Sequence, residues 1–209
     1  MQEAAVATRS LVLASGSPRR QELLRRIGLT FGVRVPGIEE VRLPGEEPTV
    51  LVERLAREKA LAVASELVVE GERAEGTLVI GADTCVVLDG EVLGKPADEE
   101  DAFTMLSRLS GRTHRVLTGV AVVEVHLPCE PLRQVVDHEE TVVTFRPLTP
   151  EEIRRYIASG EPMDKAGAYG VQGLGSVIVT RVDGCFFNVV GLPLPRLAGL
   201  LKEFGVEVL

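Results

Sequence analysis

The sequence predicts an α/β fold in which a mixed β-sheet is flanked by helices. Strand-like and helix-like segments alternate in the first half of the chain, and several strand-like segments then follow one another. The 209 residues, 45% hydrophobic and 26% charged, are typical of a folded globular chain. We therefore expect a single domain over residues 1–209, in which residues 1–10 form an N-terminal extension.

The first third of the chain predicts a strand, a loop and two helices. The apolar segment Ser10–Ala14 is a short buried strand, and Ser17-Pro18 supplies the N-cap and first residue of a helix that ends at Gly28. A loop over Pro44–Pro48 precedes a second helix that opens at Thr49. Apolar residues recur at helical spacing in both, namely Leu23, Leu24 and Ile27, then Val52, Leu55, Ala56, Ala60 and Val63.

The middle of the chain predicts strands around one helix. Thr77–Leu88 is nearly continuous apolar sequence, and Asp89-Gly90 is typical of a tight turn into a strand over Glu91–Leu93. The acidic run Asp98–Asp101 is typical of a helix N-terminus, and that helix ends at Ser110-Gly111. Two further segments alternate like paired strands, Thr113–Val125 and Glu139–Phe145, with a polar connection between them.

The last third predicts two helices separated by a glycine-rich segment. Thr149-Pro150-Glu151-Glu152 has the pattern of a capping box, and its helix ends at Ser159-Gly160. The segment Glu161–Gly175 holds four glycines after its first residues, and a loop of this length is usually functional. We expect a hairpin around Asp183-Gly184 and a last helix from about Pro195.

Composition excludes several classes of function. With 23 basic and 31 acidic side chains the net charge is −8, and aromatic residues make up 4%, so nucleic acid is not an expected partner. No apolar run approaches the roughly 20 residues of a membrane span, so we expect no membrane partner. The three cysteines (Cys85, Cys129, Cys185) and three histidines (His114, His126, His138) show no zinc or disulfide spacing, which fits a reducing, cytoplasmic protein.

Two arginines stand where a helix disfavours them. Arg19 and Arg20 fall in a first helical turn, where the positive end of the dipole opposes cations. Free N–H groups there, with Gly16 and Ser17 before them, would suit a phosphate, whose charge the two guanidinium groups would balance. Solvated surface arginines are an equally good interpretation of this feature alone.

A lysine and an aspartate interrupt apolar patterns. Lys59 falls on the inward stripe of its helix, although a lysine at the edge of the stripe is the commoner case. Asp83 stands inside a buried strand, where a carboxylate needs a metal, a cation or a catalytic task, unless it caps a turn. Lys95 and Lys165, in glycine- or proline-containing loops, would suit a polyphosphate, and Glu39-Glu40 would suit Mg²⁺ or Mn²⁺.

Several ordered motifs together resemble the Maf family of nucleoside triphosphate pyrophosphatases, over nearly the whole chain from about Leu11. They are Leu13-Ala14-Ser15-Gly16-Ser17-Pro18-Arg19-Arg20, Gly81-Ala82-Asp83-Thr84, Leu93-Gly94-Lys95-Pro96, Leu109-Ser110-Gly111-Arg112, Asp164-Lys165-Ala166-Gly167-Ala168-Tyr169-Gly170-Val171-Gln172-Gly173 and Asn188-Val189-Val190-Gly191-Leu192-Pro193. The resemblance implies a two-lobed mixed-sheet fold with a central cleft, related to inosine-triphosphate pyrophosphatases.

The resemblance also implies an activity and its residues. Members of the family cleave nucleoside triphosphates between the α and β phosphates with a divalent metal, Mg²⁺ or Mn²⁺. Asp83 would then be the proton acceptor for the attacking water or a metal ligand, and Glu40 would join the metal site, although Gly37 stands where relatives often have an acidic residue. The residues implied to line the phosphates are Ser17, Arg19, Arg20, Lys59, Lys95 and Lys165.

Three residues imply the subgroup that acts on dTTP and UTP rather than on 7-methyl-GTP. That subgroup carries the second arginine of Ser-Pro-Arg-Arg, a threonine after the catalytic aspartate and a glutamine before a late glycine. Here the residues after Pro18 are Arg19 and Arg20, with Thr84 and Gln172 at the other two places, and Arg19 is taken as the specificity arginine. The leading hypothesis is thus an enzyme removing dTTP, UTP or modified pyrimidine triphosphates. The alternative is a nucleotide-sensing regulator of septum formation, and a homodimer is the prior expectation for either.

Overall fold

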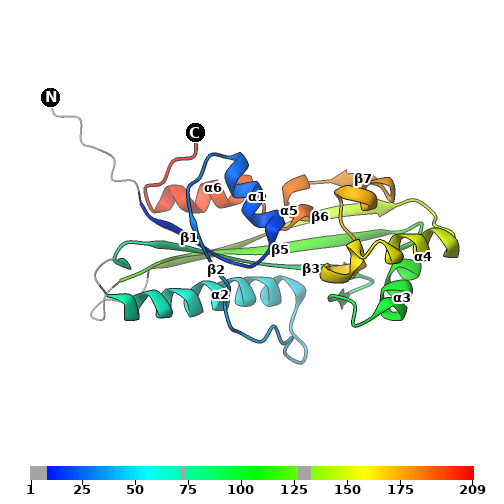
Figure 1. Ribbon diagram of the computed structural model, residues 1–209, viewed down its shortest axis with the longest axis horizontal. Coiled ribbons are helices and arrows are strands. Elements are labelled where there is room, and N and C mark those ends of the chain that lie inside the picture. Colours follow the sequence, from blue (N-terminus) through cyan, green and yellow to red (C-terminus); the bar gives the residue numbers. More distant parts are fainter. Residues whose placement is uncertain (1–8, 72–73, 127–132) are drawn as a thin grey trace.

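The computed structural model describes residues 9–71, 74–126 and 133–209, and in them one mixed seven-stranded sheet runs along the molecule (Figure 1). The strand order is β2-β1-β3-β5-β6-β7, with β4 beside β3. β1 pairs in parallel with β2 and β3, and every other pairing is antiparallel. The strands are β1 Leu11–Ala14, β2 Gly32–Arg34, β3 Leu78–Leu88, β4 Glu91–Leu93, β5 Thr113–Glu124, β6 Gln134–Phe145 and β7 Val179–Asp183. The predicted fold class is confirmed.

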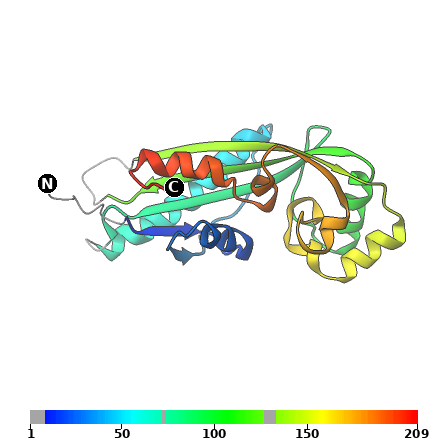
Figure 2. The same ribbon diagram turned by 90° about the horizontal axis from the view of Figure 1, so that it is seen from above.

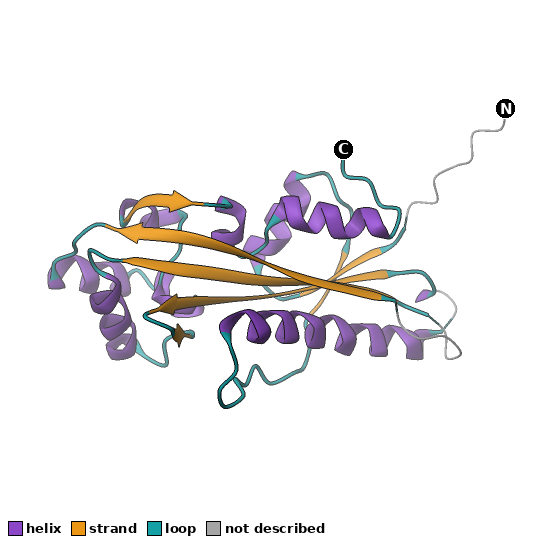
Figure 3. Cartoon of the chain, turned by 180° about the vertical axis from the view of Figure 1, so that it is seen from behind, coloured by secondary structure: helices purple, strands orange, loops and turns teal. Residues whose placement is uncertain are grey.

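Helices cover both faces of the sheet (Figure 3). Their bounds are α1 Pro18–Arg26, α2 Pro48–Glu70, α3 Glu99–Leu109, α4 Pro150–Ala158, α5 Phe186–Val190 and α6 Leu194–Glu203, with short 3₁₀ turns η2 Glu161–Asp164, η3 Ala166–Ala168 and η4 Gly173–Val177. Alternate residues of β3 point to opposite faces. Val79 therefore packs in the cluster under α2, whereas Ile80 packs with the leucines of α1 and α6.

The long strands carry two lobes. Beyond the end of β1, strands β3, β5 and β6 continue into a second core, where Val86 and Val116 pack against Leu106 of α3 and Ile153 of α4. Figure 2 shows this lobe at the opposite end of the sheet from β1 and β2. On the side of β3 away from β5, pairing with β1 stops at Gly81 and pairing with β4 starts at Val86, so residues 82–85 present an open edge between the lobes.

Two glycines bring α2 unusually close to the sheet. A Cβ on Gly81 would lie 2.1 Å from the carbonyl oxygen of Ala56, and one on Gly119 would lie 2.1 Å from that of Val52. Glycine is needed at both positions because any side chain would meet the helix backbone. This close packing sets how near the side chains of α2 lie to β3.

Most predicted elements are confirmed, and among the differences the short helix α5 had no sequence prediction. β2 had no sequence prediction, β6 begins at Gln134 rather than Glu139, and α2 begins one residue earlier than Thr49. The predicted hairpin at Asp183-Gly184 is wrong, because β7 leads into α5 and not into a strand. The side chain of Thr141 holds that turn, accepting a hydrogen bond from Cys185 N and donating one to Cys185 O.

The capping box of α4 forms as predicted, with Thr149 and Glu152 each bonded to the other's backbone N–H. Gly28 follows α1 in the left-handed conformation, also as predicted. Most of the expected N-terminal extension, part of the connection between β5 and β6, and Cys129 lie outside the described residues. Within the described part of the chain, none of the helices is both long and apolar enough to cross a bilayer.

Candidate active site

A cleft of about 800 Å³ opens at the unpaired edge of β3, between the two lobes. It is bounded by the loop after β1, the first turn of α1, the loop before α2 and the glycine-rich segment after α4. Ligands of open α/β sheets commonly bind at such a place, outside the carboxyl ends of parallel strands. Every residue that the family resemblance implied for the site contributes to the lining: Ser17, Arg19, Arg20, Glu40, Lys59, Asp83, Thr84, Lys95, Lys165 and Gln172. Glu39, the other half of the acidic pair named from the sequence, does not line the cleft.

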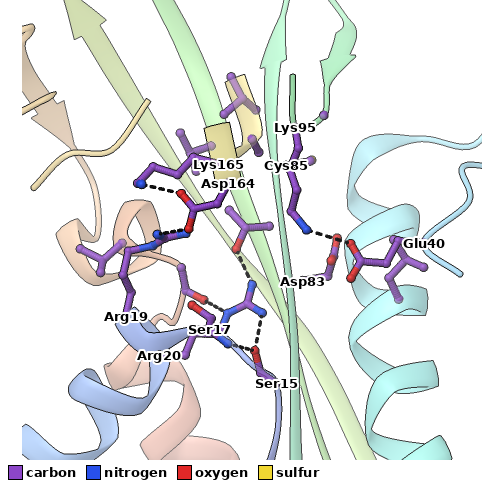
Figure 4. A pocket seen from close by; sticks show the side chains of 18 of the residues that line it. Ser15, Ser17, Arg19, Arg20, Glu40, Asp83, Cys85, Lys95, Asp164 and Lys165 are labelled. Carbon is purple, nitrogen blue, oxygen red and sulfur yellow. Dashed lines mark hydrogen bonds and ion pairs between the residues drawn. The ribbon is translucent and has the colours of Figure 1, made fainter. Parts of the chain in front are cut away.

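A buried lysine joins two carboxylates on one side of the cleft. Lys59 Nζ lies 2.6 Å from Asp83 Oδ1 and 2.8 Å from Glu40 Oε1, while the exposed Lys95 Nζ lies 3.9 Å from Glu40 Oε2. Lys59 is 5% exposed and Asp83 is 7% exposed. Figure 4 shows the carboxylates of Asp83, on β3, and Glu40, in the loop before α2, pointing toward each other. Lys59 is therefore a buried ion-pair partner and does not extend to the solvent as a lysine at the edge of the stripe would.

The charges around Glu40 favour its ionised form. Partial burial raises the pKa of Glu40, but the hydrogen bond and charge of Lys59, with the charges of Lys95 and Arg20, outweigh it, so the pKa is lowered below its usual value. Two carboxylates then converge on the cleft, and Lys59 takes one oxygen of each. Their remaining oxygens are hard donors that suit Mg²⁺ or Mn²⁺, because such ions in nucleotide sites take one or two carboxylates and complete their shell with phosphate and water oxygens.

The opposite side of the cleft is formed by the start of α1. Ser17 is the N-cap residue without a side-chain capping bond, and Pro18 follows it at the first helical position. The backbone N–H groups of this first turn therefore have no side-chain cap, which is the arrangement that binds anions. No acidic residue lies in this turn. The interpretation of the turn as an anion site is consistent with these features.

Asp164 links two of the cations that the sequence singled out. Its Oδ2 accepts from Arg19 Nη1 at 2.9 Å and its Oδ1 accepts from Lys165 Nζ at 2.6 Å (Figure 4). Burial raises the pKa of Asp164, but its bonds to Lys165 and Arg19 prevail and lower it. This carboxylate balances the charges of the two cations.

Arg20 donates four hydrogen bonds to backbone carbonyls and hydroxyl groups of the protein. Its Nε donates to Gly191 O at 2.7 Å, Nη1 donates to Ala82 O at 2.9 Å and to Ser15 Oγ at 3.2 Å, and Nη2 donates to Thr84 Oγ1 at 3.0 Å. Burial lowers the pKa of Arg20, although the charges of Asp83 and Glu40 act in the opposite direction. The bond to Ala82 O satisfies a carbonyl of the open β3 edge.

Comparison with known proteins identifies the family. The model of the family described as Maf-like protein matches residues 10–204. The chain belongs to the Maf family. It is 52% identical over 198 residues to a protein named dTTP/UTP pyrophosphatase from Symbiobacterium thermophilum, covering 95% of each chain. It is 53% identical over 197 residues to a dTTP/UTP pyrophosphatase from Escherichia coli, covering 93% of each chain.

A solved structure, that of the Staphylococcus aureus Ham1 protein, is similar to this Maf protein with a TM-score of 0.44 and 15% sequence identity. The likeness covers 94% of this chain and 97% of that one.

The carboxylate of Glu161 anchors the glycine-rich segment of the Maf protein. Glu161 accepts hydrogen bonds from the backbone N–H groups of Leu174 and Gly175 at 2.9 and 3.0 Å and from Tyr156 OH at 2.8 Å. Burial raises the pKa of Glu161, but these bonds outweigh it and lower it. The clamp closes the segment that carries Lys165 and Gln172 into the cleft.

Sequence reasoning did not single out Ser15, Asp164, Glu161 or Cys85 as site residues. Asp164 and Ser15 lay inside quoted motifs, so a search for carboxylates beside the candidate lysines could have found Asp164. Cys85 lines the cleft, but burial and the charge of Asp83 raise the pKa of its thiol to about 12, so it is no thiolate nucleophile at neutral pH.

Among the described residues, one group of side chains that could hold a metal ion lies outside the cleft. Glu53, Asp137 and His138 come together between α2 and β6, although the histidines showed no metal spacing in the sequence. His138 Nδ1 is 2.6 Å from Glu53 Oε1, and Asp137 is paired with Arg196. Glu40 and Asp83 are not part of this group.

Proposed function

We propose that this protein hydrolyses dTTP and UTP to the nucleoside monophosphate and pyrophosphate. The observation that carries the proposal is the convergence of Asp83, Glu40 and the candidate cations on one cleft, in a chain about half identical to proteins named dTTP/UTP pyrophosphatase. Phosphoryl transfer needs positioning and charge stabilisation more than covalent chemistry from the protein. A cleft that combines cations with paired carboxylates supplies both.

The triphosphate is held, in this proposal, by cations from both lobes. Ser17 and the N–H groups of the α1 turn receive one phosphate, with Arg19 and Lys165 beside it and with Lys95 and Lys59 on the far side. Arg20 contributes its charge and its remaining N–H. Asp164 releases Arg19 and Lys165 in exchange for phosphate oxygens, which is favourable because phosphate offers more charge and more acceptors.

Asp83 accepts the proton of the water that attacks the α-phosphorus, and pyrophosphate leaves. Lys59 donates a hydrogen bond to Asp83 Oδ1 and so fixes the direction of this oxygen. A divalent ion held by Glu40, and by Asp83 if its second oxygen turns to the metal, would supply charge neutralisation at the phosphates.

Recognition of the base is assigned to Arg19, Thr84 and Gln172. Their side chains offer hydrogen-bond donors and acceptors to a pyrimidine edge, and a buried polar group left unpaired by the wrong base discriminates strongly. The Glu161 clamp bonds the backbone of Leu174 and Gly175, two and three residues after Gln172.

The experiment is pyrophosphate release from dTTP, UTP, CTP, GTP and 7-methyl-GTP, with Mg²⁺ or Mn²⁺, run beside Asp83→Asn. Metal-dependent turnover of dTTP and UTP that the variant loses, while it still binds nucleotide, supports the proposal. Turnover of 7-methyl-GTP alone contradicts the assigned specificity. Binding without turnover in the wild type would instead favour a nucleotide-sensing regulator of septum formation.

We also propose that the protein acts in the cytoplasm as a single domain over residues 1–209, with the nucleotide as its partner and a homodimer as its assembly. The free thiols of Cys85 and Cys185 are consistent with a reducing compartment. Size-exclusion chromatography with light scattering measures the assembly directly.

A further inference from the structure

A chain of hydroxyl groups runs from the cleft into the protein. Thr84 on β3 and Thr118 on β5 are directly opposite each other in the antiparallel pair, and their Oγ1 atoms are 3.0 Å apart. Thr118 Oγ1 in turn donates to the backbone carbonyl of Asn188 on α5 at 3.1 Å. Thr118 and Asn188 are both fully buried, whereas Thr84 is half-buried and lines the cleft.

The direction of each hydrogen bond in this chain follows from the inventory of protons. A hydroxyl has one hydrogen, and a carbonyl can only accept. Because Thr118 gives its hydrogen to Asn188 O, it can only accept from Thr84. Thr84 therefore donates its own hydrogen to Thr118 Oγ1. One lone pair of Thr84 Oγ1 accepts a hydrogen bond from Arg20 Nη2 at 3.0 Å.

Arg20 cannot reverse this order, because a guanidinium has donors and no acceptor. It is also fixed on three further sides by Gly191 O, Ala82 O and Ser15 Oγ. Thr84 is thus left with a single lone pair toward the cleft and no free proton.

We infer that Arg20, Thr118 and the Asn188 carbonyl set Thr84 as an obligatory hydrogen-bond acceptor, so that the nucleoside group it recognises is a donor. The inference rests on the proposed function and deepens it. The imide N–H of thymine and uracil is such a donor, whereas cytosine presents a lone pair at the same ring position. A sugar hydroxyl is the other donor that a nucleotide offers. Thr118 is then a positioning residue that acts on specificity through Thr84.

The test compares Thr118→Val with Thr118→Ser. Valine keeps the shape and removes the acceptor, so the Thr84 hydroxyl can turn and donate, while serine keeps the chain intact. We expect wild type and Thr118→Ser to prefer UTP over CTP by about tenfold or more, the effect of one unpaired buried polar group. In Thr118→Val the preference for UTP over CTP, measured as the ratio of their kcat/KM values, should shrink at least fivefold, mainly because kcat/KM for CTP rises. If Thr118 had a purely structural role, its replacement would lower kcat/KM for UTP and for CTP equally.

A UTP analogue lacking the sugar 3′-hydroxyl separates the two donors. If Thr84 recognises the sugar, Thr118→Val shrinks the preference for UTP over that analogue and not over CTP. Either result supports an acceptor at Thr84. Equal effects of Thr118→Val on all three nucleotides overturn it.

Thr84→Val keeps the inference testable if Thr118→Val does not fold. It should lower turnover of the substrate that carries the recognised donor by a larger factor than turnover of the one that lacks it, and an equal fall for both overturns the inference. If wild type releases no pyrophosphate from any nucleotide, the proposed function has failed, and the same ratios are then measured as Kd values by calorimetry.

Discussion

Lys59 of α2 and Asp83 of β3 form a buried ion pair, with 2.6 Å between Nζ and Oδ1. The pair exists because α2 approaches β3 closely at Gly81, two residues before Asp83 on the same face, where the absence of a side chain leaves room for the helix backbone. A helix at ordinary packing distance would hold Lys59 farther from the strand. Gly81 and Gly119 therefore allow α2 to bring the Lys59 ammonium to Asp83 in the cleft.

Gly81→Ala tests this dependence. The added Cβ would lie 2.1 Å from Ala56 O and 2.9 Å from Ala60 N, so α2 must shift. We expect a loss of about 1–3 kcal/mol in the free energy of unfolding from overpacking, and a larger loss of turnover because Lys59 and Asp83 separate. Denaturant unfolding and pyrophosphate release measure the two.

Gly199→Ala is the control: it lies in α6 with open space around it and should stabilise by about 0.5–1 kcal/mol. Equal behaviour of both variants would refute the packing argument.

Lys59→Met should be more damaging to stability than removal of the whole pair. The single variant leaves the Asp83 carboxylate buried without its cation, which costs about 3–5 kcal/mol, whereas an apolar replacement of both partners is often neutral. We expect the double variant Lys59→Met, Asp83→Leu to regain most of the lost stability while both variants remain inactive. Urea unfolding of wild type, single and double variants provides the comparison. Identical stability of the single and double variants would mean that the pair is not a coupled buried unit.

Glu161→Ala should loosen the segment that carries Lys165 and Gln172. It leaves the N–H groups of Leu174 and Gly175 and the hydroxyl of Tyr156 without their acceptor, which costs about 1–3 kcal/mol. We expect KM for UTP to rise more than kcat falls, since the clamp does not touch the reacting atoms. Glu66→Ala, on the exposed face of α2, is the control and should change stability by no more than about 0.5 kcal/mol. An unchanged KM in Glu161→Ala would contradict a positioning role.

His114 should make the fold sensitive to mild acid. It is 2% exposed, bonded through Nε2 to Tyr169 OH at 2.7 Å, and burial lowers its pKa from 6.5 to about 4. Between these pH values the unfolded chain binds a proton that the folded chain does not, so stability falls as pH drops from 6.5 to 4, by on the order of 3 kcal/mol. His114→Gln removes this titration and should flatten the dependence of unfolding free energy on pH in that window. Parallel curves for the two proteins would exclude His114 as the cause.

Local sequence rules predicted the elements whose signals are local. The capping box at Thr149, the acidic first turn before α3 and the proline at the start of α1 each satisfy a helix terminus within a few residues, so pattern and structure agree. The strand β2 has no such signal, because Gly32–Arg34 is short and mostly exposed and forms only by pairing with β1. The chain bends at Gly184, directly after β7, but the contacts of Thr141, far away in sequence, decide that a helix follows.

The candidate residues could be found from the sequence because they break the rules of their own elements: a lysine on an inward stripe, an aspartate in a buried strand, arginines at a helix N-terminus. Their partners could not. The bonds of Arg20 to Gly191 and Thr84, and of Asp164 to Arg19, join segments that are distant in the chain, and only the folded sheet brings them together.

The most direct test of the account is the fate of the attacking oxygen. Hydrolysis of UTP in water carrying heavy oxygen, followed by mass spectrometry of the products, shows which phosphorus the water attacks. The cleft as described predicts the label in the monophosphate and none in pyrophosphate, with no labelled product from Asp83→Asn. Label in pyrophosphate or in orthophosphate, or full activity of Asp83→Asn, would contradict attack at the α-phosphorus with Asp83 as proton acceptor.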